Sequence, residues 1–478
     1  MDTVSRTSGR SARRPLMVLG CTSDAGKSWL VTALCRWFAR QGVDVVPFKA
    51  QNMSNNARVV DGGEIGVAQW LQARAAGVEP DVRMNPVLLK PEADTRSQVV
   101  VAGRMAPELT ATPWRERGPS LWPAMTAAFD SLRAEHELVV LEGAGSPAEI
   151  NLPDLVNNRM LAHSDAAALL VADIDRGGAF AHLYGTWALV PDTTRDRLGG
   201  FVLNRFRGDA SLLAPGPQRL TELTAMPCAG VMPMLQHELP DEEGATVRAD
   251  PGPGAQRVVV LRFPYGSNLD ELHLLARAAR VTFAEHPGDL DGADLVVLPG
   301  SKHVAVDLAW LRASGFDVAL AATPARVLGI CGGCQMLGRS IDDPGGAEGG
   351  RPGRVEGLGL LPFDTVLAGD KVTARRDVTF PRDLPDPWSP LRGASASGYE
   401  IRVGRTSGDS GADAGPVWSS GRVLATTVHG LLEDPDVVER LVGRRPRLVL
   451  DDAFDVLADA VDAHLDTTLL RQLTSLTS

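Results

Sequence analysis

Arg326-Val-Leu-Gly-Ile-Cys331-Gly-Gly-Cys334 joins a short apolar run to a cysteine that has a glycine two residues before it and another two residues after it. The apolar run predicts a buried strand, and the glycines predict a sharp turn from that strand into a helix. The residue at the tip of such a turn takes a strained backbone, so its neighbours must lack bulk, and Gly329 and Gly333 leave that room. Cys331 therefore occupies the tip, where the N-terminus of the following helix favours a thiolate and can hold an oxyanion.

Two other apolar runs end in residues that suit the same chemistry. Asp294-Leu-Val-Val-Leu leads into Pro299-Gly300-Ser301-Lys302, a tight turn that would bring another backbone N–H toward the oxyanion. The predicted oxyanion hole is therefore made by Gly300, Ser301 and Gly332. Val423-Leu-Ala-Thr-Thr-Val ends directly before His429. A lone cysteine is more often a small buried apolar residue than a nucleophile, and these two neighbouring runs are what favours catalysis here.

A cysteine followed at long range by a histidine is the order of the class I glutamine amidotransferases, which this half resembles. The resemblance implies a flavodoxin-like domain in which the Cys331 thiolate attacks the side-chain amide of glutamine. Ammonia leaves, the thioester is hydrolysed, and His429 acts as base and acid. Many members carry a glutamate two residues after the histidine, but Leu431 stands there in this chain. Glu433 is a weak substitute, so either the pair suffices or the orienting group comes from elsewhere.

The length and composition of the chain restrict its class. A chain of 478 residues is too long for one core, so we expect two domains with extensions. A hydrophobic content of 44% and a charged content of 22% are ordinary for a globular enzyme, and a net charge of −11 argues against a general nucleic-acid binder. No apolar run is long enough to span a bilayer, and five scattered cysteines fit a reducing cytoplasm better than a disulfide framework.

The first half contains a second glycine-rich turn between a predicted strand, Leu16-Met-Val-Leu, and a predicted helix from Trp29 to Gln41. A strand, a glycine-rich turn and a helix in this order favour a phosphate-binding loop. Its candidate nucleotide-binding residues are Thr22, Ser23, Asp24, Ala25, Gly26, Lys27 and Ser28. Lys27 would neutralise the β and γ oxygens, and the Ser28 hydroxyl can ligate magnesium. Five residues separate Gly20 from Gly26 rather than four, and this longer loop resembles that of the dethiobiotin synthetase and cobyrinate amidase group.

The ends of later strands supply further candidates for this site. Lys49 follows the apolar run that begins at Val43, and we expect it to bind the nucleotide. Glu142 ends the run Leu138-Val-Val-Leu, and an acid at the carboxyl end of a parallel strand beside a P-loop is a usual magnesium ligand, although it can also be merely solvated. Polar residues in neighbouring loops are candidates for substrate contacts, although ordinary turns look the same. They are Gln51, Asn52, Asp61, Glu64, Glu149, Asn151, Asp173 and Asp175.

Nearly the whole chain after residue 14 is similar to the glutamine-dependent amidases of cobalamin biosynthesis. Besides the phosphate-binding loop and Cys331-Gly-Gly, the similarity rests on Phe48–Asn56, Asp61–Gly66, Met84–Pro91, Glu142–Leu152, Asp173–Gly178, Asn204–Asp209, Pro299–Lys302, Gly398–Ile401 and His429-Gly. The departures are Ala50, Cys334 and Arg402, and none of them removes a group that the chemistry needs.

This resemblance implies an α/β protein with an N-terminal dethiobiotin-synthetase-like P-loop domain and the C-terminal amidotransferase domain. ATP and Mg²⁺ would activate a carboxylate as an acyl phosphate, and ammonia from glutamine would reach it along an enclosed path. Within the family, the P-loop and the Gln51–Asn56 segment favour the member that amidates the b, d, e and g carboxylates of adenosylcobyrinic acid a,c-diamide. The alternative is the member acting at the a and c carboxylates of cobyrinic acid, or a related carboxylate amidase. The histidines show no zinc-ligand spacing, so cobalt would arrive only within the corrinoid substrate.

A protein of another class is also compatible with a P-loop: a partitioning-type nucleotide switch that carries an inactive amidase domain. Against it, Thr22 stands where such switches carry a signature lysine, and Cys331 and His429 are both present.

The expected organisation is a disordered tail at 1–14, a P-loop domain at 15–236, a linker at 237–256, an amidotransferase domain at 257–440 and a helical tail at 441–478. The linker is rich in Pro, Gly, Asp and Glu without periodicity. In the tail, apolar residues recur at helical spacing from Leu450 to Leu473, and the polar face is acidic. We therefore expect this tail to dock on the protein rather than on a membrane. The sequence leaves the oligomeric state open, a homo-oligomer included.

Overall fold

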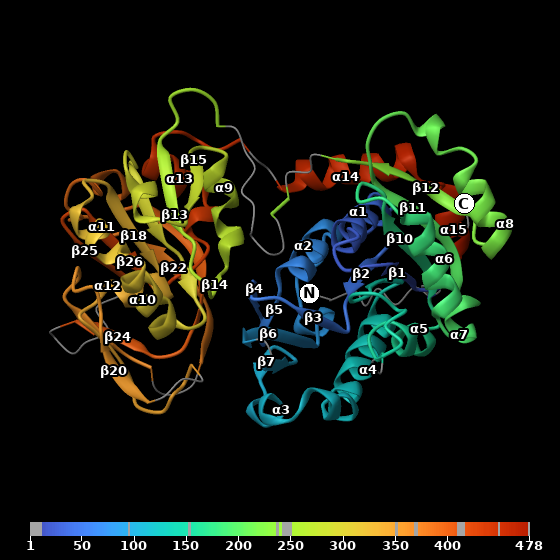
Figure 1. Cartoon of the computed structure of the whole chain (residues 1–478), viewed down its shortest axis with the longest axis horizontal. Coiled ribbons are helices and arrows are strands. Elements are labelled where there is room, and N and C mark those ends of the chain that lie inside the picture. Colours follow the sequence, from blue (N-terminus) through green and yellow to red (C-terminus); the bar gives the residue numbers. More distant parts are fainter. Residues whose placement is uncertain are drawn as a thin grey trace, which may run out of the picture.

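The computed structural model of the chain describes residues 12–93, 96–151, 154–235, 239–240, 251–348, 352–367, 371–408, 416–447 and 450–476. Residues 1–11 of the predicted tail and most of the predicted linker lie outside the described residues. Each half of the chain forms an α/β unit around its own mainly parallel sheet (Figure 1). The predicted fold class is thereby confirmed.

A parallel sheet of six strands forms the centre of the N-terminal unit. In spatial order these strands are β12 (Cys228–Pro233), β11 (Leu198–Phe206), β10 (Ala167–Asp173), β1 (Leu16–Gly20), β9 (Leu138–Glu142) and β2 (Val45–Phe48). The side chains of Leu16 to Leu19 in β1 are fully buried, as a strand covered on both faces requires. The carboxyl ends of β1, β9 and β2 meet at one edge of the sheet, so the P-loop, Glu142 and Lys49 are brought together there.

Helices cover both faces of this sheet. The helices α1 (Lys27–Arg40) and α2 (Val67–Ala76) pack on one face, and α4 (Gly118–Glu135), α5 (Asn158–Ser164) and α6 (Ala179–Leu189) pack on the other. Each face thus has its own apolar core, which is the doubly wound arrangement that the alternating strands and helices predicted.

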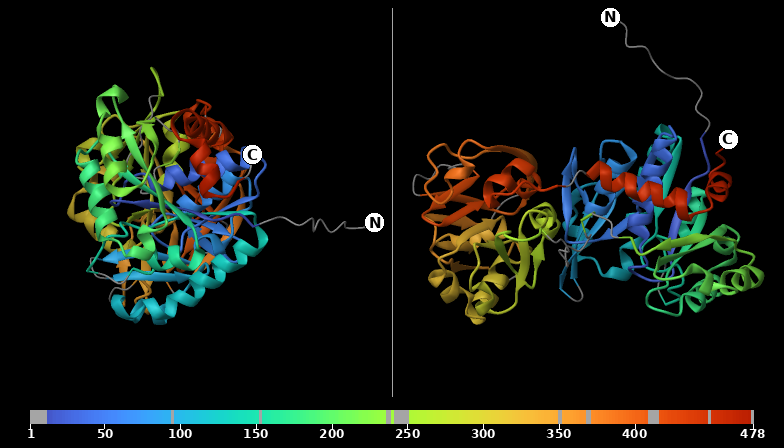
Figure 2. Two further views of the ribbon diagram at one scale, coloured as in Figure 1. Left: turned by 90° about the vertical axis from the view of Figure 1, so that its right-hand side faces the viewer. Right: turned by 90° about the horizontal axis from the view of Figure 1, so that it is seen from above.

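The C-terminal tail returns to the N-terminal unit. Of its two helices, α14 (Leu450–His464) packs along α1 and β12, and α15 (Thr467–Leu473) packs against the start of β11 (Figures 1 and 2). The apolar spacing predicted a helix through this whole stretch, but the helix is interrupted between His464 and Thr467. There the backbone N–H of Asp466 donates to the carbonyl of Ala229 at 2.7 Å. The Asp466 side chain then caps α15 by accepting from the N–H of Leu469 at 3.0 Å. None of the described helices is long and apolar enough to cross a membrane.

The C-terminal unit is built on a second sheet of six strands. In spatial order these are β15 (Arg280–Ala284), β13 (Arg257–Leu261), β16 (Leu295–Leu298), β18 (Arg326–Ile330), β26 (Val423–Thr426) and β25 (Val417–Ser420), and only β25 runs antiparallel. The first five follow the flavodoxin-like order 2-1-3-4-5. The helices α10 (Val304–Ala313), α11 (Phe316–Ala322) and α12 (Gly332–Leu337) cover one face, and α9 (Leu272–Ala276) and α13 (Pro435–Val442) cover the other.

The two units touch along a seam of small β elements. The N-terminal unit contributes the hairpin of β4 (Ala57–Val60) and β5 (Gly63–Gly66), together with the neighbouring pair β6 (Val87–Ala93) and β7 (Arg96–Val101). The C-terminal unit contributes the hairpin of β22 (Val372–Thr379) and β23 (Ser395–Arg402). Apolar side chains from both units meet there in one small buried cluster, which contains Ala57, Val59, Leu88, Val100, Tyr399 and Ile401. Figure 1 shows β4 to β7 on the side of the N-terminal unit that faces the C-terminal unit.

Candidate active sites

Cys331 lies in the strained turn between β18 and α12. Its backbone has φ +51° and ψ −107°, a conformation that a residue with a side chain rarely adopts. The turn closes so tightly that a Cβ on Gly329 would lie 2.4 Å from the Leu337 side chain, and one on Gly333 would lie 2.1 Å from the carbonyl oxygen of Leu298. The two glycines flanking the predicted nucleophile are therefore required by the backbone, as the sequence pattern indicated. Cys334, one helical turn on, points into the opposite core.

His429 lies just past the end of β26 and lines the same pocket as Cys331, whose Sγ donates to the carbonyl of Ile401 at 3.7 Å. Its Nδ1 lies 2.9 Å from Oε1 of Glu271, and the other oxygen of this carboxylate accepts the N–H of Gly430 at 2.9 Å. Both side chains are almost fully buried. Glu271 ends the short 3-10 helix η4 (Leu269–Glu271), and it therefore supplies the orienting carboxylate that the position of Leu431 lacks.

Glu433, the weak substitute considered from the sequence, does not contact His429 in the described structure. Its carboxylate lies 2.5 Å from the guanidinium of Arg58, a residue of the N-terminal unit. The short helix η7 (Leu431–Glu433) turns this side chain away from the imidazole, while Leu431 is buried in the core. Of the alternatives left open by the sequence, an orienting group from elsewhere is the one that the structure supports.

The pKa of His429 is raised to about 10. Burial alone would lower it, but the neighbouring Cys331 and Glu271 outweigh burial because both favour the imidazolium. A protonated imidazole beside the sulfur suits a thiolate nucleophile, and it can donate a proton to a leaving group. One face of the ring stacks on Tyr399, with centroids 5.5 Å apart and planes at 20°.

The three predicted oxyanion-hole residues are brought together beside the turn. Gly300 and Ser301 form the short strand β17, and a Cβ on Gly332 would lie 2.7 Å from the backbone nitrogen of Ser301. A Cβ on Gly300 would lie 2.8 Å from Cε1 of His429. The Ser301 hydroxyl donates to Asp307 at 2.5 Å, so its backbone rather than its side chain is the candidate donor.

A pocket opens beside Cys331 and His429, and both units of the chain line it. From the C-terminal unit come Lys302, Gln335 and Lys371 among others, and from the N-terminal unit come Lys90 and Gln98.

Glu64, predicted as a substrate contact, lies in this region, where its carboxylate pairs with Lys90 and with Lys371 across the seam. Burial would raise the pKa of Glu64, but the lysines hold it below its usual range. Burial also lowers the pKa of Lys302 to about 8.

The predicted phosphate-binding loop wraps around the N-terminus of α1. Lys27 Nζ donates to the carbonyls of Thr22 at 3.1 Å and Gly145 at 3.2 Å, so it bridges the two loops that follow β1 and β9. Gly26 has φ +89°, and a Cβ there would lie 2.1 Å from Nδ2 of Asn204. That same Asn204 amide donates to the carbonyl of Ala25 at 2.8 Å, and it thereby fixes the loop from the end of β11.

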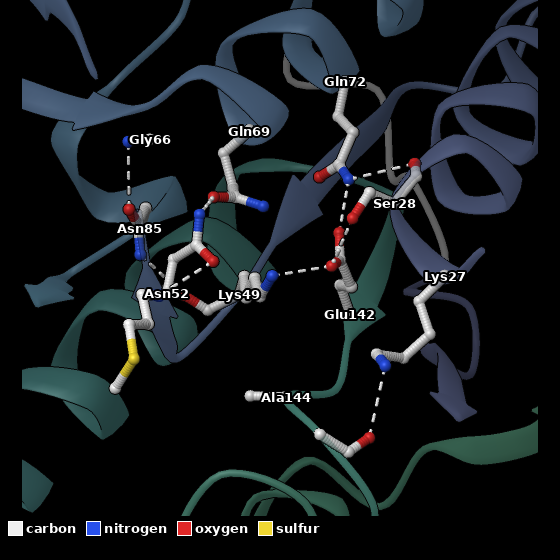
Figure 3. Close-up of polar contacts among 12 residues, drawn as sticks. Lys27, Ser28, Lys49, Asn52, Gly66, Gln69, Gln72, Asn85, Glu142 and Ala144 are labelled. Atoms are coloured by element: carbon white, nitrogen blue, oxygen red, sulfur yellow. Dashed lines mark hydrogen bonds and ion pairs between the residues drawn. The ribbon is translucent and has the colours of Figure 1, made fainter. Parts of the chain in front are cut away.

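Glu142 is the centre of the polar network at this edge of the sheet (Figure 3). Its Oε1 accepts from the Ser28 hydroxyl at 2.8 Å and from Lys49 Nζ at 2.7 Å, and its Oε2 accepts from Gln72 Nε2 at 2.6 Å. Burial alone would raise its pKa, but Lys49 and the hydrogen bonds keep it below its usual value. Side chains from α1, from α2 and from the residue after β2 are therefore joined at one carboxylate on β9.

Ser28 and Glu142 offer the hard oxygen donors that magnesium prefers, and their oxygens already face one another. A magnesium ion bound through one or two side-chain oxygens takes its other ligands from phosphates and water, so two donors beside a phosphate loop fit this metal. Within the described ranges, no cluster of three or more His, Cys, Asp or Glu forms an all-protein metal site.

Other predicted residues lie around the loop in different roles. Asp24, with φ +56°, pairs with Arg205 at 2.9 Å and with Arg176, and Asp173 pairs with the same Arg205 at 2.9 Å. Asp175 is exposed and pairs with Arg207 at 3.2 Å. These acids thus bind arginines at the rim of the loop.

The remaining candidates divide between buried and exposed positions. Asn52 is buried and donates to Gln69 at 3.1 Å, whereas Gln51 is half-buried in β3 (Gln51–Met53). Asp61, Glu149 and Asn151 are exposed in loops. Thr22 is half-buried, and Ser23 is exposed.

Glu271, Gln72 and Arg58 are site residues that sequence reasoning missed. Glu271 precedes His429 by 158 residues, and Gln72 is separated from Glu142 by 70. Each lies on an ordinary helix or strand with no motif around it. Only the fold brings them to the residues that the motifs identified.

Two known domain families match the chain, one for each unit. Residues 16–244 match the CobQ/CobB/MinD/ParA nucleotide binding domain, and residues 257–437 match the CobB/CobQ-like glutamine amidotransferase domain.

Relatives with known names match over nearly their full length. Cobyric acid synthase of Variovorax paradoxus (strain S110) is 52% identical over 480 residues, which cover 96% of this chain and 99% of the relative. That of Paracidovorax citrulli is 53% identical over 484 residues, covering 95% of this chain and 97% of the relative. That of Methylibium petroleiphilum is 52% identical over 499 residues, covering 97% of each.

Proposed function

The chain belongs to the cobyric acid synthase family, and from this premise we propose that it is a glutamine-hydrolysing, ATP-dependent ligase. Its substrate is adenosylcobyrinic acid a,c-diamide, whose b, d, e and g carboxylates it converts to amides. The observation that carries this function is that one chain holds both halves of the chemistry. A Cys331–His429–Glu271 site lies in the amidotransferase unit, and a phosphate loop with Ser28 and Glu142 lies in the nucleotide-binding unit.

The amidotransferase site makes ammonia. The Cys331 thiolate attacks the side-chain amide carbon of glutamine, and backbone N–H groups at Gly300, Ser301 and Gly332 stabilise the oxyanion that forms. When this intermediate collapses, the C–N bond breaks and His429 gives its proton to the departing nitrogen. Water, deprotonated by the now neutral His429, then hydrolyses the thioester and releases glutamate. Glu271 keeps the imidazole in the required orientation throughout.

The nucleotide-binding unit activates the acceptor carboxylate. An oxygen of the corrinoid carboxylate attacks the γ-phosphorus of ATP, ADP leaves, and the acyl phosphate has phosphate as a good leaving group. Lys27 and Lys49 would neutralise the phosphate oxygens as charge moves, while Ser28 and Glu142 would hold magnesium. When bound, magnesium supplies further charge neutralisation for phosphoryl transfer. Ammonia then displaces phosphate, and the amide remains.

Mass spectrometry of adenosylcobyrinic acid a,c-diamide, incubated with the protein, ATP, Mg²⁺ and glutamine, tests this function. Stepwise carboxyl-to-amide mass changes are expected with the wild-type protein. Cys331→Ala should lose them with glutamine and recover them with an ammonium salt, because only the source of ammonia is removed. Amidation of cobyrinic acid or of another carboxylate instead would overturn the substrate while leaving the two-site mechanism in place.

A further inference from the structure

A part of the N-terminal unit reaches across the seam into the surroundings of His429. Residues 56–58, at the start of β4, form contacts with the amidotransferase unit that are polar, buried and specific. Asn56 Oδ1 accepts the backbone N–H of Asn268 at 2.7 Å, and the N–H of Ala57 donates to Oδ1 of Asn268 at 3.4 Å. Asn268 has φ +56° and precedes the short helix that ends in Glu271. The turn carrying the orienting carboxylate is thus bonded to the other unit.

Arg58 extends further into the same region. Its guanidinium contacts the Tyr399 hydroxyl, pairs with Asp270 and lies 2.5 Å from Glu433. All three partners belong to the amidotransferase unit, and Arg58 is only 4% exposed. The carbon at the centre of the guanidinium lies 5.2 Å from the centroid of the Tyr399 ring. One buried cation from the nucleotide-binding unit therefore holds three groups of the amidotransferase unit.

Each of these three groups is directly linked to His429 or to its orienting glutamate. Tyr399 stacks on the imidazole, and its backbone exchanges two hydrogen bonds with His429, at 2.8 and 3.0 Å. Asp270 is the residue before Glu271, and Glu433 ends the turn that follows Gly430. The Tyr399 hydroxyl also accepts from Asn268 Nδ2 at 3.3 Å, which joins the ring to the turn. The two groups that position the imidazole, the Tyr399 ring and the turn that carries Glu271, are therefore both bound by Arg58.

The negative charges around His429 make the positions of Tyr399 and of the 268–271 turn dependent on the Arg58 guanidinium. Three carboxyl groups lie close to His429: those of Asp270 and Glu271 are buried, and that of Glu433 is half-buried. Burial raises the pKa of Glu433 to about 7, and Arg58 opposes that rise. Without the guanidinium, two of these carboxyl groups would lose their buried cation, and the turn would have to rearrange.

We propose that Arg58 is a positioning residue for glutamine hydrolysis: by holding Tyr399 and the 268–271 turn, the nucleotide-binding unit fixes the imidazole of His429 in its working orientation. The described polar contacts of the Arg58 guanidinium are with Tyr399, Asp270 and Glu433, and Arg58 does not line the pocket that contains Cys331. The proposal rests on the proposed glutaminase activity, and it makes that activity dependent on a residue of the other unit.

The test compares Arg58→Gln with Arg375→Gln in the full chain. Arg375 forms an exposed ion pair with Glu79 across the same seam at 2.8 Å. Its backbone lies opposite Tyr399 in the β22–β23 hairpin, and the substitution leaves that pairing in place, so Arg375→Gln controls for the loss of an exposed interunit cation. Ammonia release from glutamine is measured in the presence of ATP and Mg²⁺, and ammonium-dependent amidation is measured alongside. Arg58→Gln should lower kcat for glutamine about 100-fold with little change in KM, because small displacements of a catalytic group have effects of this size. Arg375→Gln should match the wild type.

Two further variants keep the result decisive. Arg58→Lys retains the charge and should recover part of the lost kcat. Tyr399→Phe keeps the stacked ring but removes the hydroxyl that Arg58 and Asn268 contact, so it should lower kcat about 10-fold even where Arg58→Gln fails to fold. Equal kcat in the wild type, Arg58→Gln and Tyr399→Phe would overturn the positioning role while leaving the glutaminase intact. A wild-type protein that releases no ammonia would instead overturn the proposed function.

Discussion

At the scale of single residues, the glutaminase site depends on a carboxylate that lies far from its partner in sequence. The contact of Glu271 with Nδ1 of His429 fixes which ring nitrogen faces Cys331, and it is one of the causes that raise the pKa of His429 to about 10. Because a raised histidine pKa keeps the imidazolium present below that pKa, the protonated form persists well into alkaline pH in the folded protein.

Glu271→Gln tests this role through the pH dependence of kcat/KM for glutamine. The substitution removes a negative charge that favours the imidazolium, so the pKa of His429 should fall from about 10 toward its ordinary value. The alkaline limb of the profile should therefore move to lower pH, and kcat should fall by roughly 100-fold to 10,000-fold because the imidazole loses its orientation. An alkaline limb that stays in place would contradict the assignment of Glu271.

The site residues that lie within a local sequence motif could be predicted from the sequence, and those outside such a motif could not. Cys331 could be predicted because a strand, a glycine pair and a helix start enforce its position within a few residues, and Lys27 and Ser28 could be predicted for a similar reason. The contacts of Glu271, Gln72 and Arg58 with the rest of the site join residues that are 70 or more positions apart in the chain. The sequence pattern around each of the three residues gives no sign of these contacts. Glu433 was considered for its closeness in sequence to His429, but the turn after Gly430 directs it to Arg58.

At the scale of elements, the C-terminal helix α14 completes the N-terminal unit. Its acidic face meets two arginines and a tryptophan of α1: Asp455 pairs with Arg36 at 2.8 Å, Asp459 pairs with Arg40 at 2.6 Å, and Asp462 accepts from the indole N–H of Trp37 at 2.6 Å. Its apolar face joins the core that contains α1 and one face of the sheet. The sequence predicted the helix and its docking. It could not predict the break at Asp466, because that break is set by contact with Ala229 on β12.

Phe454→Ala measures what this docking contributes to stability. Phe454 is 1% exposed in the core shared with α1, so its truncation should lower the free energy of unfolding by about 3–5 kcal/mol. Val456→Ala, on the exposed face of the same helix, is the matched control and should change it by less than about 0.5 kcal/mol. Denaturant unfolding followed by circular dichroism gives both values, and equal stability of the two variants would show that the helix is only loosely attached.

At the scale of the whole molecule, the seam contains buried charges as well as apolar contacts. Glu64 and Lys90 belong to the nucleotide-binding unit, Lys371 belongs to the amidotransferase unit, and all three meet beside the pocket that contains Cys331. A buried carboxylate with two ammonium partners is stable only while the set is complete. The relative placement of the two units is therefore tied to these residues.

Glu64→Gln should weaken the seam. It leaves the buried Lys90 and the nearby Lys371 without their carboxylate, and the loss of one partner from a buried charge pair lowers stability by about 3–5 kcal/mol. Small-angle scattering should show a more extended molecule, and glutamine hydrolysis should fall because the pocket loses one wall. Glu79→Gln removes the exposed pair with Arg375 instead and should change neither measurement. A compact, fully stable Glu64→Gln protein would contradict the role given to this cluster.

The return of the last helices to the first unit has a consequence for the newly made chain. On a ribosome, the strands and α1 of the nucleotide-binding unit emerge early, but α14, which packs along α1 and adds Phe454 and Leu457 to the same core, is translated after the entire amidotransferase unit. Until then, α1 lacks this helix, and Trp37 lacks its partner Asp462. The first unit to be synthesised is therefore the last to be completed, and a chain that ends before α14 contains the whole amidotransferase unit but an incomplete nucleotide-binding unit.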